Sequence, residues 1–218
     1  MALAPAIRKF TFATHVTTSV GWIGAVLVFL ALAAIGLSSE DERTVRGAYL
    51  VMAPAAWFVL VPLAHASLLS GVVLSLGTAW GLMRHYWVVL KLVITAFSTV
   101  ILLIYMGTFR QMAGVAADPV VELGLVRNPS PLLHAILALA LLLVATVLAI
   151  YKPFGMTPYG TRLQMQARGG LHSLGSTTVR ASAERRTRRW EYLLWIVALA
   201  VLALIIVSHL LGSGTHGH

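Results

Sequence analysis

The sequence predicts an all-α integral membrane protein, a bundle of five transmembrane helices with the N-terminus inside and the C-terminus outside. Hydrophobic residues make up 59% of the 218 residues and charged residues only 11%, whereas soluble domains are about 45–50% apolar and about 25% charged. The apolar residues form stretches long enough to cross roughly 30 Å of hydrocarbon as helices of about 20 residues. These stretches lack the alternation of a membrane β-barrel.

Each of the five apolar stretches is expected to be helical, because lipid offers the backbone no hydrogen-bonding partner. Pro54 and Pro62 predict a kink in the second stretch. The first apolar stretch is too long for the apolar core of a cleaved signal peptide, which is about 7–15 residues.

The chain then divides into a four-helix core (1–151), a basic linker (152–189), a fifth transmembrane helix (190–211) and a flexible outer tail (212–218). The predicted spans are Phe12–Leu37, Ala48–Leu76, Tyr86–Phe109, Pro131–Tyr151 and Trp190–Leu211.

The distribution of Lys and Arg orients this bundle in the membrane. With the N-terminus inside, the inner segments carry 11 basic residues and the outer segments four, as the positive-inside rule requires. A multi-pass protein of the cell (plasma) membrane is the corresponding prediction.

The basic linker either contacts anionic lipid headgroups, each basic residue near the surface contributing about 1 kcal/mol of attraction, or only determines topology. Nucleic acid is not an expected partner, because no folded module or aromatic platform accompanies the charge.

Three ionisable residues fall inside the predicted spans, namely His15, His65 and Lys91. Ionisable groups are costly in hydrocarbon, so each is a candidate functional residue. All three fall in the inner half of the bilayer, at depths that differ by at most roughly 10 Å, and we expect them to converge on one pocket. The alternatives are a histidine that only bonds a neighbouring backbone and a Lys91 that extends to the headgroups.

Polar residues also recur at helical spacing along the first and third spans, which predicts that these faces point into the bundle. Gly21 and Ala25 provide a small-residue face that allows close approach of another helix, in the same chain or in a homo-oligomer. The polar faces consist of Thr11, His15, Thr18 and Trp22 in the first span and of Lys91, Thr95, Ser98 and Tyr105 in the third.

The chemistry of these side chains suggests a bound cofactor. The chain contains no cysteine, which excludes iron–sulfur clusters, whereas imidazole is a good ligand for haem iron and copper. A haem b between apolar helices needs one or two axial ligands, and Lys9, Arg84 or His85 are candidate partners for its propionates. Proton transfer through His and Lys without a cofactor is the alternative use of the same groups.

A second, looser set of metal-binding residues is predicted on the outer side. His134 begins the fourth span and His209 ends the fifth, with Met106 and Met112 nearby in sequence. Histidine and methionine are ligands that copper accepts. These residues therefore predict an outer copper site as the alternative to packing.

The first span and the start of the third resemble a known superfamily. His15 is followed seven residues later by Trp22, and the segment Trp87-Val88-Val89-Leu90-Lys91-Leu92 opens the third span. The first pattern resembles the opening helix of HemJ-type protoporphyrinogen oxidases and of CopD-like copper-resistance membrane proteins. The second resembles the start of the third helix in HemJ-type proteins, and the resemblance covers about the first 150 residues. The resemblance implies haem b, with His15 as an axial ligand, Lys91 as a second functional group, and Trp22 and Trp87 beside the cofactor. His65 is not part of this pattern.

Three functions follow from these observations. The first is a haem-dependent membrane oxidoreductase that exchanges electrons with a quinone, a porphyrinogen or a protein partner. His15 ligates the iron, and His65 or Lys91 either supplies the opposite ligand or acts on the substrate as a catalytic residue. The second is a CopD-like copper-handling protein in which outer histidines, His134 and His209, and methionines capture the metal and His65 relays it inward. The third is a non-catalytic membrane scaffold in which the buried polar groups only determine packing.

Overall fold

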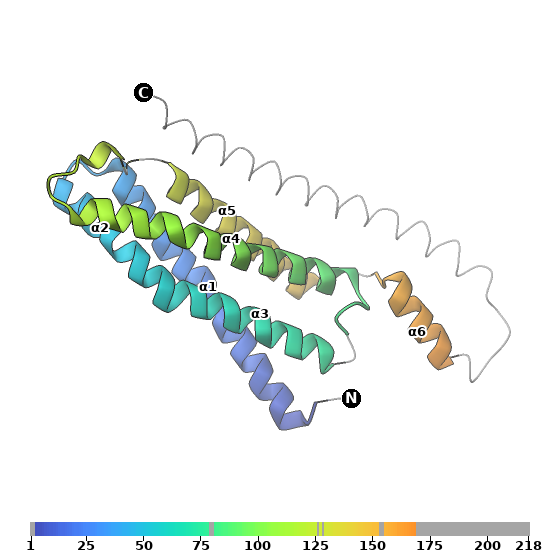
Figure 1. Ribbon diagram of the computed structural model, residues 1–218. Helices are drawn as coiled ribbons and strands as arrows, with labels where there is room; N and C mark the ends of the chain where they lie inside the picture. Colours follow the sequence, from blue (N-terminus) through green and yellow to red (C-terminus); the bar gives the residue numbers. More distant parts are fainter. Residues whose placement is uncertain (1–2, 79–80, 126, 128, 153–154, 169–218) are drawn as a thin grey trace.

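The structure is a computed structural model, and it describes residues 3–78, 81–125, 127, 129–152 and 155–168 (Figure 1). The described part is built of helices joined by short connections and contains no β-strand. Its elements are α1 (Pro5–Ser38), α2 (Glu42–Ala55), the π-helix η1 (Ala56–Leu60), α3 (Val61–Leu76), α4 (Tyr86–Ala117), the 3-10 turn η2 (Leu123–Leu125), α5 (Ser130–Tyr151) and α6 (Pro158–Arg168).

Among the described residues, four helical segments are long and apolar enough to cross a membrane: α1, the continuous α2–η1–α3, α4 and α5. The predicted class, an α-helical membrane bundle, is therefore confirmed for the described residues. The predicted fifth span, 190–211, lies outside them, so the count of five stays a prediction. α1 and α4 extend past the predicted spans Phe12–Leu37 and Tyr86–Phe109. The reason is that hydropathy marks the apolar stretch, whereas a helix continues until its end is capped.

The four segments pack as an up-and-down bundle. α1 contacts α2, α3 and α5, and α4 contacts the same three helices, so α1 and α4 lie on one diagonal of the bundle. The core fills the half of the bundle where α1 and α4 meet α2. Its largest members are Trp22 and Phe29 of α1, Tyr49 and Met52 of α2, and Met106, Phe109 and Met112 of α4.

The second membrane segment is interrupted where its two prolines predict a kink. Pro54 lies inside α2 and Pro62 in the first turn of α3, and the five residues between the two helices form a π-helix. Proline lacks the amide hydrogen that continues an α-helix, and π-helical turns are a recognised way of accommodating such a break.

Charge is distributed unevenly between the two ends of the bundle. We call the end formed by the start of α1, the α3–α4 connection, the end of α5 and α6 the basic end. Among the residues with described side chains it carries no Asp or Glu, and its cations are Arg8, Lys9, Arg84, Lys91, Lys152 and Arg162. The opposite end, which we call the acidic end, carries Glu40, Asp41, Glu42, Asp118 and Glu122 beside four arginines.

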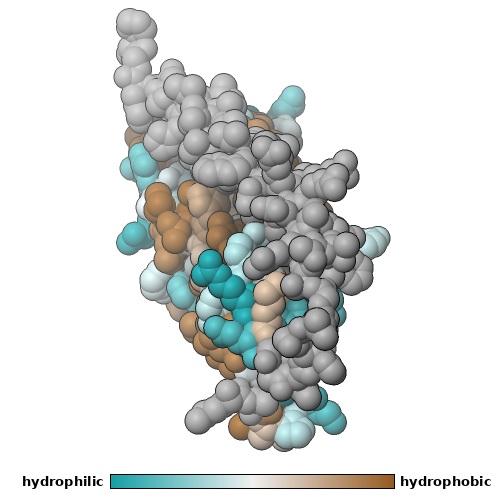
Figure 2. Space-filling view, turned by 90° about the vertical axis from the view of Figure 1, so that its right-hand side faces the viewer, coloured by the Kyte–Doolittle hydropathy of each residue, from teal (hydrophilic) through white to brown (hydrophobic). Residues whose placement is uncertain are grey.

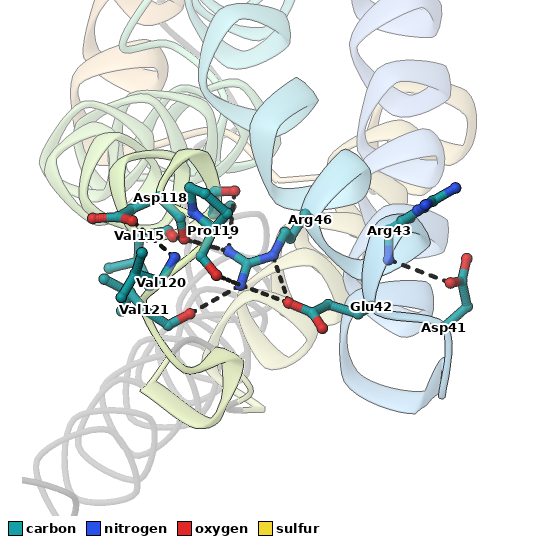
Figure 3. Close-up of polar contacts among 10 residues, drawn as sticks. Asp41, Glu42, Arg43, Arg46, Val115, Asp118, Pro119, Val120 and Val121 are labelled. Atoms are coloured by element: carbon teal, nitrogen blue, oxygen red, sulfur yellow. Dashed lines mark hydrogen bonds and ion pairs between the residues drawn. The ribbon is translucent and has the colours of Figure 1, made fainter.

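At the acidic end, Arg46 ties α2 to the C-terminus of α4 (Figure 3). Its guanidinium donates to five backbone carbonyls, including those of Asp118 at 2.7 Å and Val121 at 2.9 Å, and pairs with Glu42 at 2.7 Å. Arg46 Nη1 also lies 3.4 Å from the carbonyls of Val115 and Ala116 in the last turn of α4, which adds less than the bonds to Asp118 and Val121.

The α1–α2 connection is held by side chains as well. Asp41 is the N-cap of α2 and accepts from the backbone amides of Arg43 and Thr44. The Thr44 hydroxyl, which also donates to this carboxylate, is the main cause that holds the pKa of Asp41 below its usual value. Arg127 donates to the carbonyl of Ser39 at 2.8 Å, which caps the end of α1 in the same manner.

Part of the predicted linker 152–189 is helical, since α6 occupies Pro158–Arg168. α6 is anchored to the α3–α4 connection, because the Thr157 amide donates to the Arg84 carbonyl at 2.9 Å and the Tyr86 amide to that of Gly155 at 3.4 Å. Gly160 makes the close approach possible, because a Cβ at this position would lie 2.4 Å from the Arg84 carbonyl oxygen.

Candidate functional site

His15 lies on α1 and points toward α3. Its Nδ1 is 3.0 Å from the carbonyl oxygen of Ser67 and 3.1 Å from the hydroxyl of Ser70. A carbonyl oxygen only accepts hydrogen bonds, so these partners place the hydrogen on Nδ1 and leave the lone pair on Nε2. The half-buried ring is therefore held in one tautomer with Nε2 as its acceptor.

The partner of Nε2 is Lys91 of α4. The Lys91 Nζ lies 3.1 Å from His15 Nε2, and the ammonium donates to the imidazole. The pair joins α1 to α4 across the diagonal of the bundle, at the end opposite to the core contact between Phe29 and Phe109. Any metal bound to His15 would use the same nitrogen, so a metal and the Lys91 ammonium compete for it.

Small residues of α3 create the space for the imidazole. A Cβ on Gly71 would lie 3.0 Å from His15 Cε1, closer than an ordinary van der Waals contact. One turn away, the hydroxyls of Ser19 and Ser67 are 2.8 Å apart and tie α1 to α3. Sequence reasoning missed Ser67, Ser70 and Gly71; their spacing of three and four residues, small and polar within an apolar span, is the signal that identifies this face.

A cavity of about 370 Å³ opens beside the pair at the basic end. Figure 2 views the molecule from this end and shows hydrophilic side chains gathered among hydrophobic ones. Apolar residues such as Phe12, Leu74 and Leu92 form the walls. The cavity is also lined by His15 and by four cations, Arg8, Lys9, Lys91 and Lys152, and none of its described lining residues is acidic.

Of the three ionisable residues expected to converge, the structure brings together His15 and Lys91 but places His65 elsewhere. His65 Nδ1 bonds the carbonyl of Val61 on its own helix at 2.8 Å, and His65 is not among the described residues that line the cavity. Successive residues of a helix are about 100° apart, so His65 faces away from the side of α3 that carries Ser67 and Gly71.

Of the other residues predicted to contact a cofactor, some line the cavity and some do not. Trp87 and Lys9 line the cavity. Trp22 is 3% exposed and belongs to the hydrophobic core instead. Arg84 and His85, the other candidate partners for propionates, lie in and beside the α3–α4 connection and are not among the described lining residues.

The polar stripe of α4 does face the interior, since Thr95 and Ser98 are buried. Its far member, Tyr105, belongs to the half of the bundle nearer the acidic end. The Tyr105 hydroxyl is 2.9 Å from that of Ser130, and its ring stacks on His134 with the ring centres 4.2 Å apart.

His134, predicted as part of an outer copper site, has its Nδ1 2.8 Å from the carbonyl of Ser130. His209 lies outside the described residues. Within the part of the chain that the structure describes, no three side chains of His, Cys, Asp or Glu gather as a metal site would require. A haem iron, which takes only one or two axial protein ligands, is not subject to that requirement.

Comparisons with protein-family models, with curated proteins and with solved structures found no match for this chain.

Proposed function

We propose that the protein is a haem-b-binding redox protein of the membrane in which His15 is an axial ligand to the iron. The observation that carries the proposal is the orientation of the His15 ring. A backbone carbonyl accepts from Nδ1–H, which leaves Nε2, the acceptor of Lys91 Nζ, as the nitrogen that could bind iron in a histidine that lines the cavity. Metal-ligating histidines are typically held in this way, because the second hydrogen bond fixes the tautomer and raises the basicity of the ligating nitrogen.

The residues around the cavity fit a haem in three respects. They supply an imidazole, apolar walls for a macrocycle, and cations suited to two propionates. The volume lies within the range of about 300–1,000 Å³ that is usual for small-molecule sites. Bound haem would supply one-electron chemistry, with a quinone, a porphyrinogen or a protein as the proposed partner. Lys91 is the second functional group of this proposal, and His65 has no part in it.

The same residues, His15 and Lys91, support kinship with the HemJ-type and CopD-like membrane proteins as a part of the proposal.

An orientation with the basic end in the cytoplasm is proposed too, since cations dominate that end. The chain has no cysteine, so single cysteines can test this orientation without background. On intact cells, an impermeant maleimide should label Glu40→Cys and spare Met83→Cys. The reverse labelling would refute the orientation.

The first test of haem binding is the visible spectrum of the purified protein, oxidised and then reduced with dithionite. We expect a Soret band, with α and β bands after reduction. A featureless spectrum after expression with ample haem would refute the proposal. Copper found by metal analysis of such a colourless preparation would favour the copper-handling alternative, and a preparation without copper would favour the scaffold.

Variants then test the ligand assignment. His15→Ala should lose most of the haem, while His65→Ala and His134→Ala, matched controls on other faces, should retain it. Lys91→Met should bind haem at least as well as the parent, because it removes the ammonium that competes for Nε2. Circular dichroism would show that each variant is folded. Full haem occupancy in folded His15→Ala would exclude His15 as the ligand.

A further inference from the structure

His65 lies on the outward face of the second membrane segment, away from the cavity. Its ring is half-buried, and its neighbours along the same face of the helix are exposed: Phe58 is 74% exposed and Leu69 is 63% exposed. Ionisable side chains within a membrane span almost always face the bundle interior or a water-filled cavity. His65 departs from this rule, so its position calls for a reason other than packing within the bundle.

The His65 ring presents a hydrogen-bond acceptor to this apolar face. Its Nδ1 lies 2.8 Å from the carbonyl oxygen of Val61. A carbonyl only accepts, so the hydrogen is on Nδ1 and the lone pair on Nε2. Within the described part of the chain Nε2 has no hydrogen-bond partner, and the flanking residues Phe58, Pro62 and Leu69 offer no donor. A polar atom in hydrocarbon without a partner is costly, so the face is suited to a molecule that brings a donor.

The depth of His65 limits which molecule this is. His65 lies roughly 16 Å from the end of its span at Leu76, near the middle of a hydrocarbon layer roughly 30 Å thick. Phospholipids and sterols hold their polar groups at the membrane surface and bring no donor to this depth. A quinol with an apolar tail dissolves in the hydrocarbon and carries hydroxyl donors on a flat ring.

A second copy of the chain does not supply the donor either. Two copies related by a two-fold axis along the membrane normal would place one His65 opposite the other. Each ring holds its hydrogen on Nδ1, against the carbonyl of Val61. The two Nε2 atoms would then both be acceptors, and two acceptors cannot bond to each other.

The outward face of α3 is also close to the proposed iron ligand. Ser67, two residues after His65, provides the carbonyl that accepts from His15 Nδ1. An α-helix with its side chains is about 10–12 Å across. A molecule at His65 is therefore separated from the site of His15 by the width of one helix.

We infer that the outward face of α3 binds a lipid-soluble quinol, with one quinol hydroxyl donating to His65 Nε2 and the quinol ring packed on the apolar stripe of Phe58, Pro62 and Leu69. The inference rests on the proposed function in that it selects the quinone from the electron partners named there. Binding itself requires no iron.

The test compares two probes that share one apolar body and differ in their donors, decylhydroquinone and its dimethyl ether. In anaerobic phosphatidylcholine nanodiscs that hold the full chain, each competes with an alkylphenol whose tail carries a photoreactive diazirine. Mass spectrometry then measures the fraction of chains labelled on α3 around His65. We expect decylhydroquinone to compete about tenfold more effectively than the ether, equivalent to about 1.4 kcal/mol for one hydrogen bond. Equal competition would overturn the inference.

Matched variants identify the acceptor of this hydrogen bond. His65→Phe keeps an aromatic ring but removes the acceptor, so both probes should compete equally in it. Ile104→Phe, the control, adds the same ring at a 70% exposed position of α4 and should keep the preference for decylhydroquinone. His15→Ala should keep this preference even if it loses haem, which separates the inference from the proposed iron ligand. A preference that persists in His65→Phe would exclude His65 as the acceptor.

Occupation of this face by a second copy is measured separately. Because the chain has no cysteine, Leu69→Cys provides a single reactive group on the outward face of α3. We expect a short bismaleimide to join few chains to one another through this cysteine. Efficient cross-linking that decylhydroquinone does not reduce would show that another copy covers the face, and would overturn the inference.

Discussion

Replacing Arg46 with methionine should destabilise the bundle more than any other removal of a single charge at the acidic end. Methionine keeps the length of the apolar stem but has no donor. The Arg46 side chain is only 14% exposed, and its guanidinium contacts backbone rather than solvent. The substitution therefore removes the side chain that holds the carbonyls of Asp118 and Val121, in the segment that follows α4, against α2 (Figure 3).

The expected loss of stability follows from the lengths of the hydrogen bonds that Arg46 makes. The bonds to the carbonyls of Asp118 and Val121, at 2.7 and 2.9 Å, are well formed, whereas the other three are 3.4–3.5 Å long and add little. A hydrogen bond from a charged donor contributes about 1.5–3 kcal/mol. Because these carbonyls can be rehydrated at the membrane surface, we expect a loss of about 2–4 kcal/mol. The pair with Glu42, which is 62% exposed, adds less than about 1 kcal/mol.

The assay is unfolding in detergent followed by circular dichroism, with two controls on the same helix. Glu42→Gln removes the ion pair and keeps the five carbonyl contacts, so it should cost much less than Arg46→Met. Arg43→Met removes a neighbouring exposed arginine and should have little effect. Arg46→Lys keeps the charge but not the forked donor set, and should fall between the parent and Arg46→Met. If Arg46→Met were no more destabilising than Arg43→Met, the reasoning would be refuted.

Three further predictions concern single contacts. Gly36→Ala should destabilise by about 1–3 kcal/mol in thermal unfolding, because its Cβ would lie 2.7 Å from the buried ring of Tyr49; an unchanged midpoint would contradict this. Tyr105→Phe should cost about 0.5–1.5 kcal/mol for the lost bond to Ser130, and no loss in the same assay would show that the bond contributes nothing. Because the folded pKa of Asp41 is depressed below 3.8, its contribution to stability is present above that pH and is lost as the pH falls through the folded value. Asp41→Asn should therefore show a smaller acid-induced loss of stability than the parent, and identical pH profiles would contradict the assignment.

The membrane class and the approximate spans could be predicted from the sequence because they depend on local properties. Hydropathy over about 20 residues is sufficient to identify a transmembrane helix, since lipid imposes the same requirement on every segment. The same logic identified His15 and Lys91, because ionisable side chains inside a span are costly wherever the helix packs. It also located the break between Pro54 and Pro62, which depends on the missing amide hydrogens of proline.

Which of these groups meet was decided only by the tertiary structure. His15 and His65 are equivalent as intramembrane histidines in sequence, yet packing turns His15 toward Ser67 and Lys91 and leaves His65 bonded to its own helix. The cation-lined cavity likewise combines the first turn of α1 with the end of α5, which are far apart in the chain. Hydropathy determines how deep a residue lies in the membrane, whereas the rotation of each helix about its axis depends on contacts with its neighbours. That rotation determines which side chains share a site.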